Sequence, residues 1–285
     1  MSNENIYMKQ IKKTKPFLRW AGGKQWLIKL FSQLSNNEYN SYFEPFLGGG
    51  SLFFNLNPKK SFLSDINFNL INTYEILKNY PNKLTSELQK WKNDKETYYK
   101  IRESKFDNRI KKAAQFIYLN KTCWNGLYRV NKLGKFNVPF GNNNRLIFSK
   151  ENLLKCSEIL KNANLNNCDF EVTLKYGQKA DLIYLDPPYT VLHSNNGFRQ
   201  YNEKLFTWDD QIRLSNLASN LNKMGCLVIT SNANNEMIKE LYPDFICLQI
   251  SRYSIIAAQA SFRRRITELL FISKNININL NLSEE

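Results

Sequence analysis

One short segment constrains the fold of this chain most. It is an apolar run that ends in a carboxylate, two prolines and a tyrosine. Residues 181–185 predict a buried strand, because the four residues after Asp181 are large and apolar. Proline cannot donate to a sheet ladder, so Pro187 and Pro188 end the strand and fix the backbone beyond it. Asp186 and Tyr189 are therefore expected on a stiff loop at the carboxyl end of a strand, where open α/β sheets bind ligands.

This loop combines a carboxylate, fixed carbonyl groups and an aromatic face within four residues. An exocyclic amine on a flat base requires such a set, since the amine can donate to Asp186 and to the Pro187 carbonyl while the ring stacks on Tyr189. The alternative is a polar turn that only ends a strand, which an isolated Asp-Pro-Pro would favour. The preceding strand favours a catalytic site made of Asp186, Pro187, Pro188 and Tyr189.

Strands and helices alternate on both sides of a charged helical stretch. The predicted strands are 42–46, 61–64, 181–185, 226–230, 245–250 and 268–273, and the predicted helices of the same part are 69–77 and 208–223. Such alternation favours an α/β fold with a mostly parallel, doubly wound sheet, which we expect to resume near Cys168. Residues 77–150, with helical segments at about 82–104 and 108–120, are predicted as an insertion between the halves 1–76 and 151–285. Residues 275–282 fit an edge strand and a flexible tail equally well.

The charge of the chain points to a polyanionic partner. Forty Lys and Arg against 25 Asp and Glu give a net charge of +15. Residues 108–150 contain nine basic residues and no acidic one, and residues 8–29 contain seven and none. These stretches predict contacts with nucleic-acid phosphates, with a generic basic surface as the alternative.

Cysteine usage and hydropathy indicate a cytoplasmic protein. The five cysteines form an odd set without a Cys-x-x-Cys pair, which favours reduced thiols over disulfides or a zinc site, and we expect no metal. No apolar run approaches a signal peptide or a membrane span. The only histidine, His193, is predicted to be a loop residue, so a nucleophile system based on histidine is not expected.

A glycine-rich turn at residues 44–50 lies at a predicted strand-to-helix junction, where glycines let the backbone approach a ligand closely. Asp65 follows 15 residues after Gly50, at the end of the next predicted strand, where a carboxylate can accept hydrogen bonds from ribose hydroxyls. The spacing is shorter than that of the dinucleotide fingerprint, and the pattern is not Gly-x-Gly-x-x-Gly. We therefore expect a nucleoside ligand other than NAD. A helix cap is the alternative for Asp65.

Taken together, these motifs resemble those of the Dam-type (D12 class, alpha group) DNA adenine-N6 methyltransferases. Residues 17–24 resemble the first motif of that family, residues 43–50 its cofactor loop and residues 125–129 with 136–141 its DNA-reading segment. Residues 65–67 are similar to the family's ribose contacts, and Asp169 with Phe170 is similar to its adenine contacts. Residues 186–189 are similar to its catalytic motif. The resemblance runs in order from about Pro16 to Ile272.

The resemblance implies a seven-stranded Rossmann-like domain that uses S-adenosylmethionine and is interrupted by a helical target-recognition domain. The implied cofactor residues are Trp20, Lys24, Glu44, Phe46, Gly48, Gly50, Asp65, Asp169, Phe170 and Asp186. Among them, Asp65 would take the ribose, and Asp169 and Phe170 the adenine ring. Trp20 and Lys24 would contact the methionine part or the pocket that joins it to the target base, with a core tryptophan as the alternative for Trp20.

For the partner, the resemblance implies double-stranded DNA with a flipped adenine against Tyr189. The implied DNA-binding residues are Arg19, Trp124, Asn125, Leu127, Arg129, Asn137 and Pro139. Arg129 is the best candidate for bidentate pairing with guanine, and Arg19 stands where the family often has lysine. Leu127 and Pro139 could contact a thymine methyl, and Trp124 could wedge into the gap left by the base. A phosphate or packing contact is the alternative for each.

The segment most resembles relatives that methylate GATC, which is therefore the expected site. Two other functions remain open at this point. One keeps fold and cofactor but acts on cytosine-N4, RNA or a protein amide, and the other is a DNA-binding protein without catalysis. Three arginines at 263–265 fit a phosphate contact or a solvated turn. The resemblance fits both an orphan enzyme and one paired with a cognate restriction endonuclease, and it implies no obligate protein partner.

Overall fold

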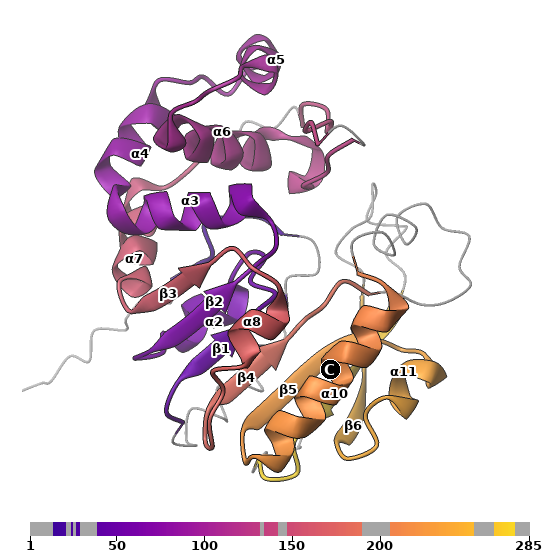
Figure 1. Ribbon diagram of the computed structural model, residues 1–285. Helices are drawn as coiled ribbons and strands as arrows, with labels where there is room; N and C mark the ends of the chain where they lie inside the picture. Colours follow the sequence, from indigo (N-terminus) through magenta and orange to yellow (C-terminus); the bar gives the residue numbers. More distant parts are fainter. Residues whose placement is uncertain are drawn as a thin grey trace, which may run out of the picture.

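The computed structural model describes residues 14–20, 24, 27–28, 39–131, 134–141, 147–189, 206–253 and 265–276. His193, Arg263, Arg264 and the segment after residue 276, about which the sequence made predictions, lie outside these ranges. At the centre is a seven-stranded sheet in the order β3-β2-β1-β4-β5-β7-β6 (Figure 1). Its strands are β1 Tyr42–Glu44, β2 Ser61–Ser64, β3 Ala163–Asn166, β4 Leu182–Leu185, β5 Leu227–Ala233, β6 Ile246–Tyr253 and β7 Arg265–Ile272.

The strand directions define the class of the sheet. Strands β1 to β5 pair in parallel, whereas β7 runs antiparallel to both of its neighbours, β5 and β6. This confirms the predicted α/β fold with a seven-stranded, Rossmann-like methyltransferase sheet. The carboxyl ends of the adjacent strands β1, β2, β4 and β5 lie along one edge, and the loops that follow them are thereby gathered at one place.

Two hydrophobic clusters cover the two faces of the sheet, because successive side chains of a strand point to opposite faces. Tyr42 and Tyr184 join the cluster that contains α2 (Ser51–Leu56) and α3 (Phe68–Asn79). Their neighbours Phe43 and Ile183 join the cluster of α8, α10 and α11. Figure 1 shows α8 and α10 on the same face of the sheet. These helices span Phe170–Leu174, Trp208–Lys223 and Glu236–Glu240.

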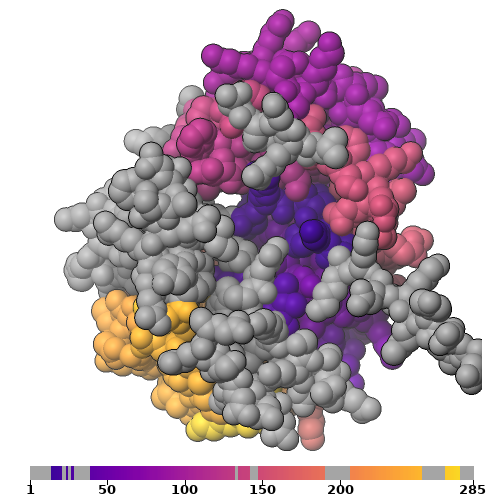
Figure 2. Space-filling view, turned by 180° about the vertical axis from the view of Figure 1, so that it is seen from behind, coloured from indigo at the N-terminus to yellow at the C-terminus, as the bar shows by residue number. Residues whose placement is uncertain are grey.

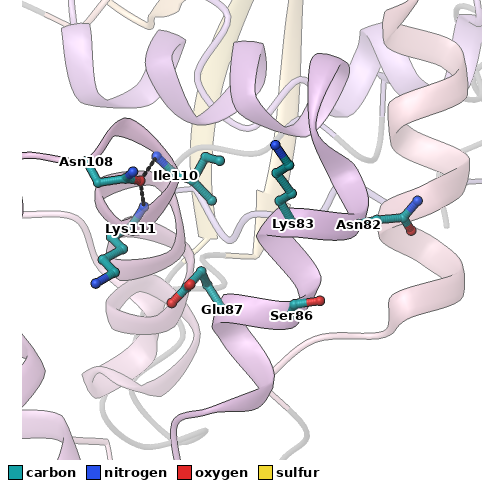
Figure 3. A pocket seen from close by; sticks show the side chains of 7 residues that line it. All are labelled: Asn82, Lys83, Ser86, Glu87, Asn108, Ile110 and Lys111. Atoms are coloured by element: carbon teal, nitrogen blue, oxygen red, sulfur yellow. Dashed lines mark hydrogen bonds between the residues drawn. The ribbon is translucent and has the colours of Figure 1, made fainter.

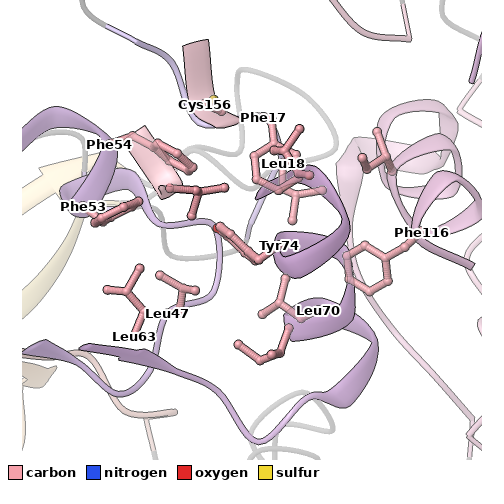
Figure 4. Packing of buried hydrophobic residues seen from close by; sticks show 14 of the residues in the cluster. Phe17, Leu18, Leu47, Phe53, Phe54, Leu63, Leu70, Tyr74, Phe116 and Cys156 are labelled. Atoms are coloured by element: carbon pink, nitrogen blue, oxygen red, sulfur yellow. The ribbon is translucent and has the colours of Figure 1, made fainter. Parts of the chain in front are cut away.

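The predicted insertion forms a layer of helices above α3 (Figure 1). It contains α4 (Pro81–Gln89), α5 (Lys95–Glu103) and α6 (Arg109–Thr122), and α3 packs against α6 and against α7 (Lys150–Leu160). The hydrophobic cluster runs from the sheet into this layer without interruption. Figure 4 shows Phe116 of α6 in the same cluster as Tyr74 of α3 and Leu63 of β2. The division at residues 77 and 150 stays a prediction.

The predicted elements are present with shifted ends. Helix α10 and strand β2 have the predicted bounds, whereas β1 ends at Glu44, before Pro45. The expected helical stretch at 82–104 is two helices, because Asp94 caps a new helix by accepting from the N–H of Thr97 at 2.7 Å. Helix α7 and strand β3 were missed. Because β3 ends at Asn166, the alternation does resume near Cys168, but with β3 and not first with residues 181–185.

Two further findings bear on the sequence predictions. All five cysteines are free thiols, as expected. Of the helices in the described ranges, none has the length and apolar character needed to cross a membrane.

Candidate active site

The glycine turn after β1 lies against Trp20. Gly48 and Gly50 have positive φ values of 47° and 62°, a conformation that side chains disfavour. A Cβ atom on Gly48 would lie 2.7 Å from Cδ1 of Trp20, and one on Gly49 would lie 2.9 Å from Cβ of Trp20. The backbone of the turn thus packs directly on the indole, and the structure brings two of the predicted cofactor motifs together.

Asp65 joins this turn to the end of β2. Its Oδ2 accepts from the N–H of Gly48 at 3.0 Å and its Oδ1 from the N–H of Asn67 at 2.9 Å. Burial raises the pKa of Asp65 above its ordinary value. Helix α3 is capped by Asn67, whose side chain accepts from the N–H of Leu70, so the alternative of Asp65 as the cap is wrong. The next side chain, Ile66, is 72% exposed beside the turn.

The loop after β4 carries an ion-pair network around Asp186. Oδ1 of Asp186 accepts from Oγ of Ser231 at 2.7 Å and lies 3.0 Å from Nζ of Lys24. The same Nζ lies 3.7 Å from Oε2 of Glu268 and 4.8 Å from the ring centroid of Tyr189. Lys24 is buried, as is Glu268 of β7. The predicted pocket residue Lys24 therefore contacts both ends of the predicted catalytic motif.

Two buried side-chain amides connect the same loop to helix α10 and strand β5. Nε2 of Gln211, on α10, donates to the carbonyl of Pro188 at 3.3 Å, and Nδ2 of Asn232 donates to Oε1 of Gln211 at 2.9 Å. Neither side chain is exposed to solvent. Gln211, Ser231, Asn232 and Glu268 were not predicted from the sequence. A signal for two of them is the polar run Thr230-Ser231-Asn232 at the carboxyl end of an apolar strand.

Glu44, the last residue of β1, is buried and accepts a hydrogen bond from the hydroxyl of Tyr42 at 2.8 Å. Burial raises the pKa of Glu44 to about 8, against the opposing effect of the Tyr42 hydrogen bond, and the negative charge of Asp186 adds to the rise. Glu44 is therefore protonated at neutral pH, so that this part of the site carries less negative charge than the sequence suggests.

The raised pKa of Glu44 predicts a pH-dependent stability. The folded protein holds this proton up to about pH 8, whereas the unfolded chain releases it near the ordinary pKa of 4.5. The resulting stabilisation is fully present below pH 4.5 and is lost as the pH rises to 8, at no more than about 1.4 kcal/mol per pH unit. We expect Glu44→Gln to remove this contribution. Between pH 5 and pH 8 the unfolding free energy of the wild type should therefore fall relative to that of the variant. Urea titrations at both pH values measure it, and an unchanged difference would contradict the assignment.

Asp169 and Phe170 stand at the start of α8, and both contact Arg213. Asp169 caps the helix by accepting from the N–H of Glu171 at 2.9 Å, and its Oδ2 lies 2.9 Å from Nη2 of Arg213. The Arg213 guanidinium lies 4.3 Å from the ring centroid of Phe170, which also packs against Phe46 at 5.5 Å. The ring of Phe170 is thus part of the core. What this pair can offer a ligand is the half-exposed carboxylate of Asp169 and the first N–H of the helix.

The predicted DNA-reading segment lies in an irregular hairpin, described over residues 123–131 and 134–141, which begins with a short helical turn at Trp124–Gly126. Bridges join Cys123 to Phe140 and Val130 to Phe136, and the N–H of Trp124 donates to the carbonyl of Pro139 at 2.8 Å. Figure 2 shows the magenta residues of this part of the chain below the purple helices and beside the indigo N-terminal residues. The exposed side chains include most of the predicted reading residues, namely Trp124, Asn125, Arg129, Asn137 and Pro139, while Leu127 is half-buried.

The hairpin orients Arg129 before any ligand binds. Nε of Arg129 donates to Oδ1 of Asn137 at 2.8 Å, and the N–H of Asn137 donates to the carbonyl of Arg129 at 3.1 Å. Arg109, another of the basic residues between 108 and 150, forms an ion pair with Glu75 and hydrogen-bonds Asn72. The acid-free stretch therefore supplies both surface charges and internal contacts.

A surface hollow of about 350 Å³ lies between α4 and the start of α6 (Figure 3). It contains none of the residues that the sequence predicted for the site; its lining is Asn82, Lys83, Ser86, Glu87, Asn108, Ile110 and Lys111. The chemistry described above lies at the strand ends instead. Over the part of the chain that the structure describes, no cluster of three or more His, Cys, Asp or Glu residues could hold a metal ion.

The seven-stranded sheet and the polar groups at its strand ends fit a methyltransferase of the Rossmann-like class. Comparison with known proteins specifies it further, since the family model described as D12 class N6 adenine-specific DNA methyltransferase matches residues 20–257. The chain belongs to this family.

Curated relatives match nearly the whole chain. It is 38% identical to the Type II methyltransferase M1.LlaDCHI of Lactococcus lactis subsp. cremoris, over 93% of this chain and 98% of that protein. The Type II methyltransferase M.MjaIII of Methanocaldococcus jannaschii is also 38% identical, over 91% and 99%. The DNA adenine methylase of Escherichia coli K12 is 31% identical, over 93% and 97%. By its family and by the names of its relatives, the chain is an adenine-specific DNA methyltransferase.

Proposed function

We propose that this enzyme transfers a methyl group from S-adenosylmethionine to the N6 amino group of a flipped adenine within GATC in duplex DNA. The observation that carries the proposal is the Asp-Pro-Pro-Tyr loop, with Asp186 held by Lys24 and Ser231 at the carboxyl end of β4 and next to the glycine turn.

The residues at the ends of β1 and β2 fit the proposed cofactor. Asp65 uses one lone pair of each oxygen on a backbone N–H, so that each oxygen keeps a lone pair for a ribose hydroxyl. The exposed Ile66 supplies an apolar surface beside it for the adenine ring, and Asp169 would accept from the adenine amine. Trp20, Gly48 and Gly50 would cradle the methionine part with Glu44 and Phe46 beneath. When bound, S-adenosylmethionine supplies an electrophilic methyl group on a sulfonium.

The residues of the catalytic loop would activate the target amine. Ser231 and Lys24 both contact Oδ1 of Asp186, which directs Oδ2 to one amino proton, and the Pro187 carbonyl accepts the other. These bonds localise the nitrogen lone pair and stabilise the positive charge that develops on nitrogen. Pro187 and Pro188 hold the geometry, and Tyr189 stacks on the base. A base in duplex DNA reaches this loop only after it leaves the helical stack.

The exposed face of the hairpin supports the proposed reading of DNA. Arg129, oriented by Asn137, would pair with O6 and N7 of a guanine through its remaining N–H groups. The indole of Trp124 is 46% exposed, as a side chain that fills the gap of a flipped base would be. Asn125, Leu127, Pro139 and Arg19 would contact neighbouring base edges. The choice of GATC rests on the resemblance of this segment to relatives with that site.

The experiment that tests the proposal is single-molecule sequencing of an unmethylated plasmid after incubation with the enzyme and S-adenosylmethionine. N6-methyladenine confined to GATC is the expected result. A different adenine motif would contradict the assignment of Arg129 and its neighbours, and modified cytosine would contradict the proposed chemistry. A reaction with an Arg129→Ala variant serves as the specificity control, because relaxed recognition is expected at the base that Arg129 reads.

The contact between Gln211 and the Pro188 carbonyl predicts an unusual pH profile for Gln211→Glu. A protonated glutamic acid can donate to this carbonyl, whereas the ionised form cannot and repels it. Burial raises the pKa of such a carboxyl group. We expect kcat of the variant to approach the wild-type value near pH 6 and to fall about tenfold below it near pH 9, while KM for DNA stays unchanged. Asn216→Asp, an exposed charge change on the same helix, is the matched control. A pH-independent ratio of variant to wild type would refute the contact's role.

A further inference from the structure

Asn120, in the last turn of α6, joins two segments that are far apart in the sequence. Its side chain is 1% exposed. Oδ1 accepts from the N–H of Arg19 at 2.8 Å, and Nδ2 donates to the carbonyl of Arg19 at 2.7 Å. Nδ2 also donates to the carbonyl of Gly126 at 3.3 Å, in the hairpin. One amide thus satisfies both backbone groups of Arg19 and one of the hairpin.

The side chain of Arg19 crosses the hairpin at the same place. A Cβ atom on Gly126 would lie 2.5 Å from Cδ and 2.8 Å from Cβ of Arg19, and Gly126 has a φ of 66°. Only glycine therefore allows Arg19 to lie this close. The next residue, Trp20, stacks on Tyr128 of the hairpin with 5.5 Å between ring centroids and 20° between planes. The segment around Arg19 and the hairpin consequently pack as one unit around Asn120.

We propose that Asn120 is a positioning residue for target-sequence recognition, which fixes Arg19 relative to the hairpin so that both read one stretch of DNA. This inference rests on the proposed reading of DNA by Arg19 and Arg129. Base discrimination through an arginine requires that its guanidinium be placed to within a fraction of an ångström. Asn120 supplies this placement from a rigid helix, because its amide is buried and hydrogen-bonded to both segments.

Asn120→Asp separates positioning from a general contribution to stability. The carboxylate keeps the acceptor for the N–H of Arg19 but places an oxygen against the carbonyls of Arg19 and Gly126. Asn72→Asp is the matched control, since Asn72 is also buried, at 2% exposure, and its Nδ2 donates to the carbonyl of Arg109 at 3.3 Å. Asn72 bonds α3 to α6 and has no hydrogen bond to Arg19 or the hairpin among the described residues.

The measurement is the rate of methylation of duplex oligonucleotides that carry the wild-type enzyme's own site or each single-base change in it. We expect Asn120→Asp to reduce discrimination about tenfold at the base pair whose recognition Arg19→Ala also relaxes. The double variant, Asn120→Asp with Arg19→Ala, should discriminate between bases as well as Arg19→Ala does alone. Asn72→Asp, whose carboxylate would face the Arg109 guanidinium, should leave the discrimination profile unchanged, whatever its Tm. If Asn120→Asp does not fold, Gly126→Ala displaces Arg19 without removing the amide and should relax the same base pair.

Two results would overturn the inference. One is a wild-type discrimination profile for Asn120→Asp or Gly126→Ala, whatever their Tm. The other is an Arg19→Ala variant that discriminates like the wild type at every position. A failure of the proposed function is visible separately, as the absence of site-specific adenine methylation by the wild-type enzyme.

Discussion

Asp186→Asn is expected to lower kcat by about a thousandfold or more while S-adenosylmethionine still binds. The carboxylate has two tasks in the proposed mechanism, since it accepts a hydrogen bond from the amino group and stabilises the positive charge on nitrogen. A neutral amide lacks the charge, and with its oxygen held by Lys24 and Ser231 it would turn its NH2 group to the amine. The backbone of the loop should persist, because Pro187, Pro188 and the Gln211 contact are unchanged. Transfer of labelled methyl groups to duplex DNA measures kcat, and calorimetry with the cofactor measures binding.

Ser231→Ala is the matched control for this variant. It removes the 2.7 Å hydrogen bond to Oδ1 but leaves the carboxylate and the Lys24 ion pair, so a loss of about tenfold is expected. In Asp186→Asn, Lys24 keeps its second carboxylate partner, Glu268 at 3.7 Å. This contact limits the free-energy cost of the Lys24 charge that loses Asp186. An Asp186→Asn enzyme within tenfold of the wild type would contradict both tasks of the carboxylate.

Asp65→Ala is expected to weaken S-adenosylmethionine binding by about a hundredfold or more, with kcat at saturating cofactor changed only a few-fold. Two ribose hydroxyls would lose charge-assisted hydrogen bonds, each contributing roughly 1.5–3 kcal/mol, and the N–H of Gly48 would lose its acceptor. Equilibrium binding of a non-reactive cofactor analogue measures this effect directly.

The control for Asp65→Ala is Asn67→Ala, which removes the cap of α3 two residues further on. That variant should lower stability by about 1 kcal/mol and leave cofactor binding intact. Equal weakening by both variants would mean that Asp65 acts through the helix and not through the ribose.

The sequence was sufficient to predict those parts of the site that lie on a single strand or in the loop directly after it. Residues 182–189 predict both strand β4 and the carboxylate that follows it, because apolar side chains give way abruptly to Asp-Pro-Pro-Tyr. Helix α10 was predicted with its observed bounds. Its start follows Thr207, which forms a capping box with Asp210.

The partners of the catalytic loop could not be predicted in the same way, because they depend on strand register. Ser231 reaches Asp186 since Leu185 of β4 pairs with Thr230 of β5. Glu268 belongs to β7, which lies antiparallel between β5 and β6, and no local pattern specifies that position. Strand β3 was missed because only Leu165 among its four residues is a large apolar one, and it lies at the edge of the sheet.

The ion-pair network has a consequence for the order in which the protein can assemble during synthesis. Lys24 belongs to the first motif of the chain, whereas Glu268 belongs to β7, the last of the described strands. Until β7 leaves the ribosome, β5 has an unpaired edge and Lys24 has only one of its two carboxylate partners. The addition of β7 therefore completes both the sheet next to β5 and the ion pairs of Lys24 in one late step. A chain that ends before β7 lacks both of these features.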